Sequence, residues 1–134
     1  MRGPVVSPFC ERRAWEACHP GIDIAVRSGT PILAAADGRV SLVQPAADSG
    51  GYGNFTCVAH ASSITSCYAH QERILVHVGQ LVQRGRLIGV SDCTGRCYGP
   101  HLHFEVRLGD HVVCPAPYLG VPSSTICAPG SPGY

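Results

Sequence analysis

Eight cysteines in 134 residues are the feature that most restricts the folds open to this chain. So many cysteines, in an even number, indicate an oxidising, extracytoplasmic setting in which they form disulfides. Eight thiols allow on the order of 100 pairings. Their order along the chain nevertheless offers four short loops: Cys10 with Cys18, Cys57 with Cys67, Cys93 with Cys97, and Cys114 with Cys127. A structural zinc cluster is the alternative, but the sequence lacks the Cys-x-x-Cys knuckle typical of one.

The apolar runs between these cysteines are short, rich in Val, Ile and Tyr, and separated by Gly and Pro, which predicts an all-β domain. Helical periodicity is not sustained, and residues 12–18 allow one helical turn at most. The length predicts one domain, assigned to residues 1–119. The Pro, Gly, Ser and Thr that follow predict an irregular tail, residues 120–134, held back by Cys127. The strands are expected at residues 22–26, 32–36, 40–43, 54–60, 64–71, 76–82, 87–90 and 99–106.

The charge pattern restricts the classes of partner. The net charge is +1 and the sequence has no basic run, so we expect no nucleic-acid partner and no anionic membrane surface. No apolar run approaches the ~20 residues of a membrane helix, so we expect no membrane insertion. Residues 1–9 do not resemble a signal peptide, which predicts a truncation or a mature amino terminus. We expect a monomer.

The stretch Gly-Pro-His-Leu-His-Phe-Glu-Val at residues 99–106 carries a His-x-His pair on a predicted strand. Because successive side chains of a strand alternate faces, His101 and His103 project to one side, over an apolar layer on the other. Neutral imidazole is a preferred zinc ligand, and a strand would hold both rings in place. The pair predicts a zinc site or, alternatively, two surface histidines.

A second polar position lies in residues 19–26, after a Pro-Gly turn. Aliphatic side chains alternate here, so Asp23 lies on the face opposite Ile22 and Ile24. Burying a carboxylate in an apolar strand costs free energy unless a positive group neutralises it, and a metal ion would do so. The alternative is an exposed Asp on an edge strand.

The strands at residues 54–60 and 64–71 flank a Ser-rich turn that places Cys57 opposite Cys67. His70 then falls on the other side of the sheet. We therefore expect a disulfide that braces the sheet from behind and leaves His70 facing a site. A solvent-exposed or hydrogen-bonded histidine is the alternative.

Two loops adjoin these positions. The Gly-rich loop at residues 45–53 is interpreted as a groove wall or, equally, as a plain solvent loop. The loop at residues 93–97, if closed by a disulfide, would hold the start of the His-x-His strand rigidly.

Together these motifs resemble the LytM and lysostaphin-type zinc metalloendopeptidases of bacterial cell walls. The shared pattern is His-x-x-x-Asp, Gly-Thr-Pro, Asp-Gly, Tyr-Ala-His and Gly-Pro-His-Leu-His-Phe-Glu-Val. In this chain the motifs occupy residues 19–23, 29–31, 37–38, 68–70 and 99–106. The resemblance extends over about residues 6–119 and includes Gly-Gln-Leu-Val at 79–82 and Ile-Gly at 88–89. Motifs in this shared order are far more specific than any one of them.

The resemblance implies a compact antiparallel β sheet or sandwich of the LytM type, a duplicated hybrid motif of barrel-sandwich form, with its site in a loop-walled groove. It implies one Zn²⁺ held by His19, Asp23 and His103. His101 would be the general base, and His70 would steer water or stabilise the developing oxyanion. Three protein ligands leave one tetrahedral position for water, as a catalytic zinc requires. Zinc lowers the pKa of that water toward ~7, and a neighbouring imidazole can accept its proton.

The substrate class implied by the resemblance is the peptide part of peptidoglycan, either the stem crosslink or a glycine-rich bridge. Lysostaphin-like glycine cutters carry a tyrosine upstream of the first ligand, where this chain has Arg13, Ala14 and Trp15, so stem-peptide cleavage is favoured. We expect a secreted enzyme acting in the cell wall or periplasm. The alternative is a non-catalytic module on the same fold that binds peptidoglycan or activates another hydrolase. Such relatives lack one or more of the five site residues, all of which are present here.

The first loop departs from the family pattern at two cysteines. Cys10 stands where relatives have glycine after the phenylalanine, and Cys18 directly precedes His19. A bridge between them would shorten and stiffen this loop, so we expect it to position the metal site as well as stabilise the fold, by ~2 to 3 kcal/mol.

The remaining histidines match no site motif. They are predicted to be structural or solvent-facing, because an unpaired histidine needs no metal to explain it. They are His60, His77 and His111. The same interpretation, as fold or groove-wall residues, applies to Trp15, Glu105 and Arg107.

Overall fold

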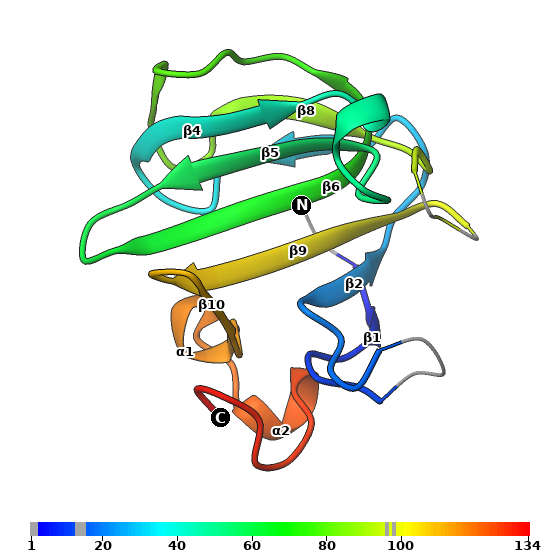
Figure 1. Ribbon diagram of the computed structural model, residues 1–134, viewed down its shortest axis with the longest axis vertical. Helices are drawn as coiled ribbons and strands as arrows, with labels where there is room; N and C mark the ends of the chain where they lie inside the picture. Colours follow the sequence, from blue (N-terminus) through cyan, green and yellow to red (C-terminus); the bar gives the residue numbers. More distant parts are fainter. Residues whose placement is uncertain (1–2, 13–15, 96, 98) are drawn as a thin grey trace.

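The computed structural model describes residues 3–12, 16–95, 97 and 99–134, which fold as mostly antiparallel β structure (Figure 1). The strands are β1 (Val5–Ser7), β2 (Ile22–Ala25), β3 (Pro31–Leu33), β4 (Gly38–Gln44), β5 (Asn54–Ala59), β6 (Ile64–Ile74), β7 (Leu81–Val82), β8 (Leu87–Ser91), β9 (His101–Leu108) and β10 (His111–Val113). Short helical segments are η1 (Ala46–Asp48), α1 (Ala116–Leu119) and α2 (Ser123–Ile126). None of the helices among the described residues is long and apolar enough to cross a membrane.

The main sheet has the strand order β1-β2-β9-β6-β5-β4-β7, and Figure 1 shows β2, β9, β6, β5 and β4 side by side. β10 pairs with β9, while β8 joins β3 to β6. The pairs formed by these strands are antiparallel. The predicted all-β, antiparallel fold class is therefore confirmed.

β6 is the longest strand and changes partner along its length. Its residues 64–69 pair with β9, and its residues 71–74 pair with β8. Between them lies His70, whose φ of 58° is in the left-handed region. One left-handed residue in a strand interrupts the pairing and bends the strand, as a β-bulge does. The bend lets one strand serve two parts of the fold.

One face of the sheet carries the main apolar core. Ile22, Leu102, Phe104 and Tyr68 lie here with the side chains of β3, β4 and β8. These positions alternate with the polar residues of β2 and β9, because a strand directs successive side chains to opposite faces. The other face carries a smaller apolar cluster together with the polar residues.

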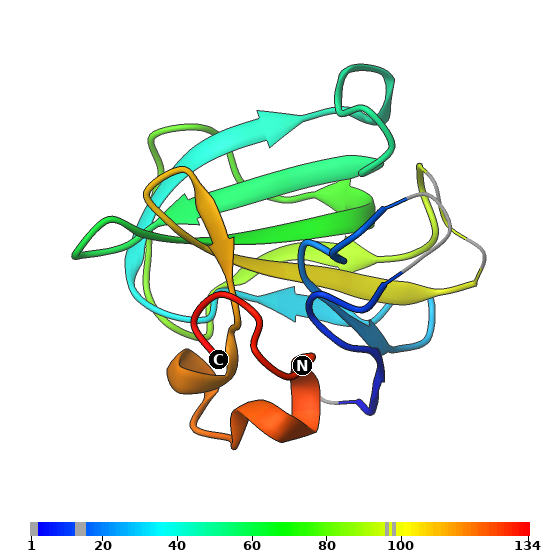
Figure 2. The ribbon, with the colours of Figure 1, turned by 60° about the horizontal axis from the view of Figure 1, so that its bottom comes forward.

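The C-terminal segment packs on the domain instead of forming an irregular tail throughout. α2 lies within residues 120–134, and Figure 2 shows it next to the N-terminal segment. The backbone N–H of Phe9 donates to Ile126 O (2.9 Å), and the N–H of Ala128 donates to Phe9 O (2.8 Å). A disulfide joins Cys114 to Cys127. These bonds connect the two ends of the described chain.

Two predicted strands are shorter in the structure, and one strand was not predicted. The strand expected at residues 76–82 is only β7, because residues 76–80 form a turn in which Gly79 has a φ of 90°. In place of strand pairing, this turn makes two backbone hydrogen bonds with Val40. The N–H of Gly79 donates to Val40 O (2.8 Å), and the N–H of Val40 donates to Gln80 O (2.9 Å). The strand expected at 32–36 ends at Leu33, and β10 was not predicted. The helical turn considered for residues 12–18 includes residues 13–15, which lie outside the described residues.

Candidate functional site

β2 and β9 bring the predicted polar residues together. Their register places Asp23 opposite His103, and Ala25 opposite His101. Directly paired residues project to the same face of a sheet. Asp23, His101 and His103 therefore share the face opposite the main core.

His19 joins them from the loop that precedes β2, and it is 2 % exposed. Its Nδ1 donates to the carbonyl oxygen of Pro8 (3.0 Å), and its Nε2 lies 3.4 Å from Asp23 Oδ1. The backbone of this loop is held in the same way, because Cys10 N–H donates to His19 O (2.8 Å) and His19 N–H donates to Glu11 O (3.1 Å). One ring nitrogen is thus anchored, and the other faces the carboxylate.

His19, Asp23 and His103 form a set of candidate metal ligands. Each offers one atom, and the three atoms lie within 4.8 Å of one another. Burial would raise the pKa of Asp23, but the hydrogen bonds from His103 and His19 lower it well below its ordinary value. The carboxylate is therefore ionised at neutral pH. Two imidazole nitrogens and one carboxylate oxygen are a donor set that fits Zn²⁺.

His101 lies beside this set and is more accessible than its neighbour on β9. Its Nδ1 donates to Gly99 O (2.8 Å), and its Nε2 lies 3.6 Å from Asp23 Oδ1. The side chain of His101 is 16 % exposed, against 6 % for His103. A ring nitrogen that lies next to the ligand set and is reachable by solvent can exchange a proton with a bound molecule.

His70 completes the cluster from β6. Its ring centroid lies 4.7 Å from that of His101 and 6.0 Å from that of His103. The Nδ1 of His70 donates to Thr94 O (2.6 Å). Burial lowers the pKa of His70 to about 4, so the imidazole is neutral at neutral pH. With the proton on Nδ1, its Nε2 is an acceptor.

The prediction that the Cys57–Cys67 disulfide lies behind the sheet, away from His70, is wrong. Ala69 is opposite His103, so Cys67, two residues earlier, shares the face of the site. The disulfide belongs to the small apolar cluster on that face. The alternation of side chains between the two faces of β6 fails at His70. Its left-handed backbone turns the His70 side chain toward the same face as Ala69.

The structure contains four disulfides, which join Cys10 to Cys18, Cys57 to Cys67, Cys93 to Cys97, and Cys114 to Cys127. The first spans the loop ahead of the ligand segment. Cys10 itself has a φ of 59°, a backbone conformation that favours glycine. The position therefore suits the glycine that the resemblance implies there, and in this chain a cysteine adopts the same conformation.

The Cys93–Cys97 loop holds the group that anchors His70. Thr94 Oγ1 donates to Gln71 O (2.6 Å) and accepts from the backbone N–H of Asn54 (3.1 Å). The carbonyl of Thr94 is thereby fixed where it receives the Nδ1–H of His70. This loop therefore orients a site histidine.

Tyr52, at the end of the loop 45–53, forms a wall of the site. Its ring stacks on Phe55 with centroids 4.3 Å apart and lies 5.7 Å from the ring of His103. Its carbonyl accepts the backbone N–H of His70 (2.7 Å). Of the two interpretations of this loop, these contacts favour the groove wall.

Glu105 and Arg107 contact the site, although the sequence suggested only fold or groove-wall roles. Glu105 Oε2 accepts from His103 Nε2 (2.8 Å), while Glu105 Oε1 accepts from Arg107 Nε (3.0 Å) and Nη2 (2.8 Å). Burial would lower the pKa of His103, but Asp23 and Glu105 together raise it to about 9. The signal was present in the sequence, since residues 101, 103, 105 and 107 are polar on one face of one strand.

The other histidines lie away from this cluster. His77 and His111 are exposed. His60 is partly buried and hydrogen-bonded through both ring nitrogens, to Asp37 O (2.7 Å) and Ser66 Oγ (2.8 Å). These surroundings agree with the predicted structural or solvent-facing roles.

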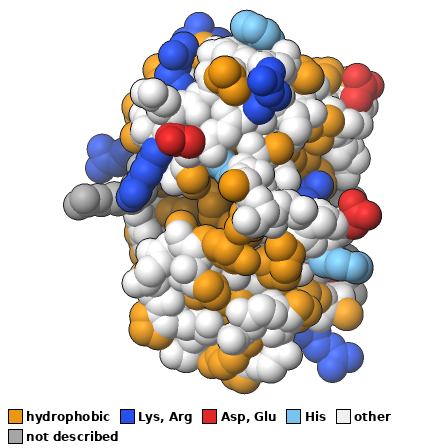
Figure 3. All heavy atoms as spheres, turned by 90° about the vertical axis from the view of Figure 1, so that its left-hand side faces the viewer, with side chains coloured by type: hydrophobic (Ala, Val, Ile, Leu, Met, Phe, Trp, Pro, Cys, Tyr) orange, Lys and Arg blue, Asp and Glu red, His pale blue; other side chains and the backbone are white. Residues whose placement is uncertain are grey.

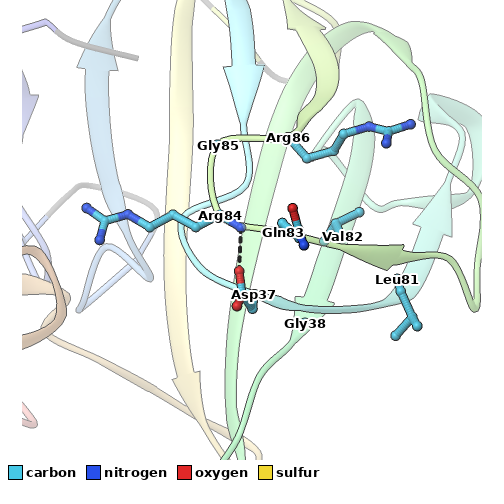
Figure 4. Close-up of a pocket in the computed structure, with 8 residues that line it drawn as sticks. All are labelled: Asp37, Gly38, Leu81, Val82, Gln83, Arg84, Gly85 and Arg86. Carbon is cyan, nitrogen blue, oxygen red and sulfur yellow. Dashed lines mark hydrogen bonds between the residues drawn. The ribbon is translucent and has the colours of Figure 1, made fainter.

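An open pocket of about 820 Å³ lies on other elements, between the turn before β4 and the β7–β8 connection (Figure 4). Asp37 Oδ1 accepts the backbone N–H of Arg84 there (2.7 Å), and Figure 4 shows the Arg84 and Arg86 side chains extending away from each other. On the face drawn in Figure 3, hydrophobic side chains gather below the middle, with charged groups scattered around them. The lining of this pocket includes none of the clustered histidines, so we place the chemistry at the histidine cluster.

Comparisons with known proteins show which family and fold this chain resembles. Residues 17–115 match Peptidase family M23. The peptidoglycan DD-endopeptidase ShyB of Vibrio cholerae is 42 % identical over 95 residues, which cover 71 % of this chain and 22 % of ShyB. The chain spans about a fifth of the length of the curated relatives that head the comparison.

Solved structures show the same fold. A zinc-containing peptidase from Vibrio cholerae has a TM-score of 0.76 and 34 % identity, covering 84 % of this chain and 35 % of that one. The catalytic domain of lysostaphin from Staphylococcus simulans has a TM-score of 0.74 and 27 % identity, covering 88 % of this chain and 90 % of that one.

Proposed function

This chain belongs to peptidase family M23, and from that premise we propose that it is a zinc endopeptidase that hydrolyses peptide bonds of bacterial peptidoglycan. The observation that carries the proposal is the set of ligand atoms from His19, Asp23 and His103 within 4.8 Å. Two further imidazoles, those of His70 and His101, adjoin this set. Three ligands with adjoining bases are the arrangement expected of a hydrolytic zinc site.

The ligands would be the atoms that already converge: His19 Nε2, Asp23 Oδ1 and His103 Nδ1. When bound, zinc would polarise the scissile carbonyl and lower the pKa of a water molecule. The anchored second nitrogens of the two histidines keep their rings in place for this role. The Cys10–Cys18 disulfide, in the loop before His19, adds to the same preorganisation.

His101 would act as the general base. Because its Nδ1 donates to Gly99 O, its Nε2 is the atom free to accept a proton from the attacking water. The same atom would return the proton to the leaving amine. Its greater exposure relative to His103 suits a residue that meets the substrate.

His70 would steer the attacking water. Its proton lies on Nδ1, bound to Thr94 O, so the Nε2 of the neutral ring accepts hydrogen bonds and cannot donate one. A developing oxyanion needs a donor, whereas a water molecule can donate to Nε2. Of the two roles implied for His70, these features favour water positioning.

The substrate would be the stem-peptide crosslink rather than a glycine-rich bridge. ShyB is named a DD-endopeptidase, and the letters DD refer to D-amino acids. Glycine has no stereocentre, so this name does not fit cleavage between two glycines. The four disulfides favour a location outside the cytoplasm, where disulfides form and persist. We infer that the protein is secreted to the cell wall or periplasm.

The test combines metal analysis with digestion of cell walls. Purified protein should contain one zinc per chain, clear suspensions of walls from several bacteria, and release fragments whose masses identify the broken bond. Loss of clearing after chelation and its return with zinc would support the proposal. Protein with stoichiometric zinc that cleaves no wall preparation would instead support a non-catalytic peptidoglycan-binding or hydrolase-activating module.

A further inference from the structure

Each of the four clustered histidines has one ring nitrogen held by a partner outside the cluster. For His19, His70 and His101 the partner is a backbone carbonyl oxygen, at 3.0, 2.6 and 2.8 Å respectively. For His103 it is the side-chain carboxylate of Glu105, at 2.8 Å. The exception needs a physical explanation.

The explanation lies in the position of His103 within the sheet. It is in β9, with β2 on one side and β6 on the other, opposite Asp23 and Ala69. Backbone carbonyls in the interior of a sheet are occupied by the ladder bonds, so they do not turn toward a side chain. The nearest same-face position on the strand is two residues along, and Glu105 occupies it.

Glu105 is held as firmly as a carbonyl would be. Its side chain is 0 % exposed, and its second oxygen accepts from Arg107 Nε and Nη2 at 3.0 and 2.8 Å. The Arg107 guanidinium also lies over the ring of Phe55, 5.6 Å from its centroid. Tyr52 interacts with both members of the ion pair. A buried carboxylate is stable only with such charge and hydrogen-bond compensation.

We propose that Glu105, held by Arg107, is a positioning residue that fixes His103 with its proton on Nε2 and its Nδ1 toward the metal. The inference rests on the proposed function, because it assigns His103 to zinc. A carboxylate behind a ligating histidine orients the ring and makes it more basic. Arg107 would act one step further back, by keeping Glu105 in place.

The first test measures the affinity of folded protein for Zn²⁺ by competition with a chromophoric chelator. Glu105→Ala should bind zinc about 10- to 100-fold more weakly than the wild type, the cost typical of such partners. Glu105→Gln should lose less, because its amide oxygen still accepts from His103. Glu72→Gln, which changes an exposed carboxylate on β6, is the matched control and should leave the affinity unchanged.

The second test is independent of whether a variant folds. Nitrogen-15 NMR of the histidine rings in zinc-loaded wild-type protein should show His103 bound through Nδ1 and protonated at Nε2. Binding through Nε2 would overturn the proposal, because that nitrogen could not then donate to Glu105.

The outcomes separate this inference from the function on which it rests. Wild-type protein that binds zinc, with Glu105→Ala equally tight, would show that Glu105 only stabilises the fold. Wild-type protein that binds no zinc at all would overturn the proposed function and the inference together. Weakened zinc binding in Glu105→Ala, in a protein that digests no wall preparation, would leave the positioning role intact and remove the hydrolase.

Discussion

The two faces of β6 carry histidine networks of opposite kinds. On the core side, His60 donates from Nδ1 to Asp37 O (2.7 Å), so its Nε2 accepts from Ser66 Oγ (2.8 Å). Ser66 in turn accepts from Tyr68 Oη (2.8 Å), which accepts the backbone N–H of Ala35 (2.9 Å). Each donor in this series of hydrogen bonds has an acceptor, so the network is complete without a ligand.

On the site side, ring nitrogens converge on one oxygen instead. His19, His101 and His103 each place a ring nitrogen 2.9 to 3.6 Å from Asp23 Oδ1. One carboxylate oxygen cannot satisfy three ring nitrogens at once, whereas a cation would take two of them, from His19 and His103, as ligands. The comparison teaches that a structural histidine is one whose two nitrogens are separately satisfied, whereas a binding histidine has one anchored nitrogen and one shared.

The largest effect expected from this difference follows His103→Ala. The variant should lose zinc, with a decrease in affinity greater than the ~10- to 100-fold typical of a residue behind a ligand. His60→Ala, from the complete network, should retain one zinc per chain. Metal analysis after dialysis distinguishes the two, and retention of zinc by His103→Ala would contradict the ligand assignment.

His101→Ala should separate catalysis from metal binding. Zinc should remain bound, while kcat/KM falls by ~10² to 10⁴, the range for removal of a general base. Rates of crosslink cleavage and zinc content are measured on the same sample, with His77→Ala as the exposed control. If His101→Ala released the metal, His101 would be a ligand instead.

Metal-free protein should lose stability as the pH falls from 6.5 to 4.5, because of His70. Its pKa is about 4 when folded against 6.5 when unfolded, so in this interval the unfolded chain binds the proton and the folded chain does not. The loss is at most ~3 kcal/mol in the free energy of unfolding. The pKa of His103 is raised to about 9, so its contribution to the free energy of unfolding changes only above pH 6.5.

Chemical denaturation across this pH interval measures the effect. His70→Asn retains a donor for Thr94 O and removes the titrating group, so its stability should depend less on pH. A slope equal to that of the wild type would show that another group is responsible.

The smallest effect concerns the complete network. His60→Ala should lower the free energy of unfolding by ~1 to 3 kcal/mol, because Ser66 and Tyr68 lose the acceptor that ends their chain. The zinc affinity should not change. His77→Ala, in an exposed turn, should stay within ~0.5 kcal/mol of the wild type. Weaker zinc binding in His60→Ala would show that the two networks are coupled through β6.

Regular strands account for what the sequence could predict. Alternation with period two places Asp23, His101 and His103 on one face, because β2 and β9 run without a bulge over these residues. The same regularity made the all-β fold class predictable. The four cysteine pairs follow from proximity in the sequence, which keeps the loops that they close short.

Irregular backbone accounts for what could not be predicted. His70 has a left-handed φ, and no glycine in the sequence marks this position. Simple alternation therefore placed the His70 side chain and the Cys57–Cys67 disulfide on opposite faces, whereas they share one face. Glu105 was visible as a polar residue on the site face. Its role depends on burial and on Arg107, which only the packed structure shows.

The parallel bridge between Phe9 and Cys127 has a practical consequence for anyone who shortens or fuses this chain. The backbone N–H and C=O of Phe9 are both hydrogen-bonded to residues at the end of α2. The carbonyl oxygen of its neighbour Pro8 accepts the hydrogen bond from His19 Nδ1. A truncation after Leu119 would remove those bonds while leaving the long strands whole. Such a protein would look well folded by circular dichroism and yet bind zinc poorly, so recombinant boundaries belong beyond Cys127.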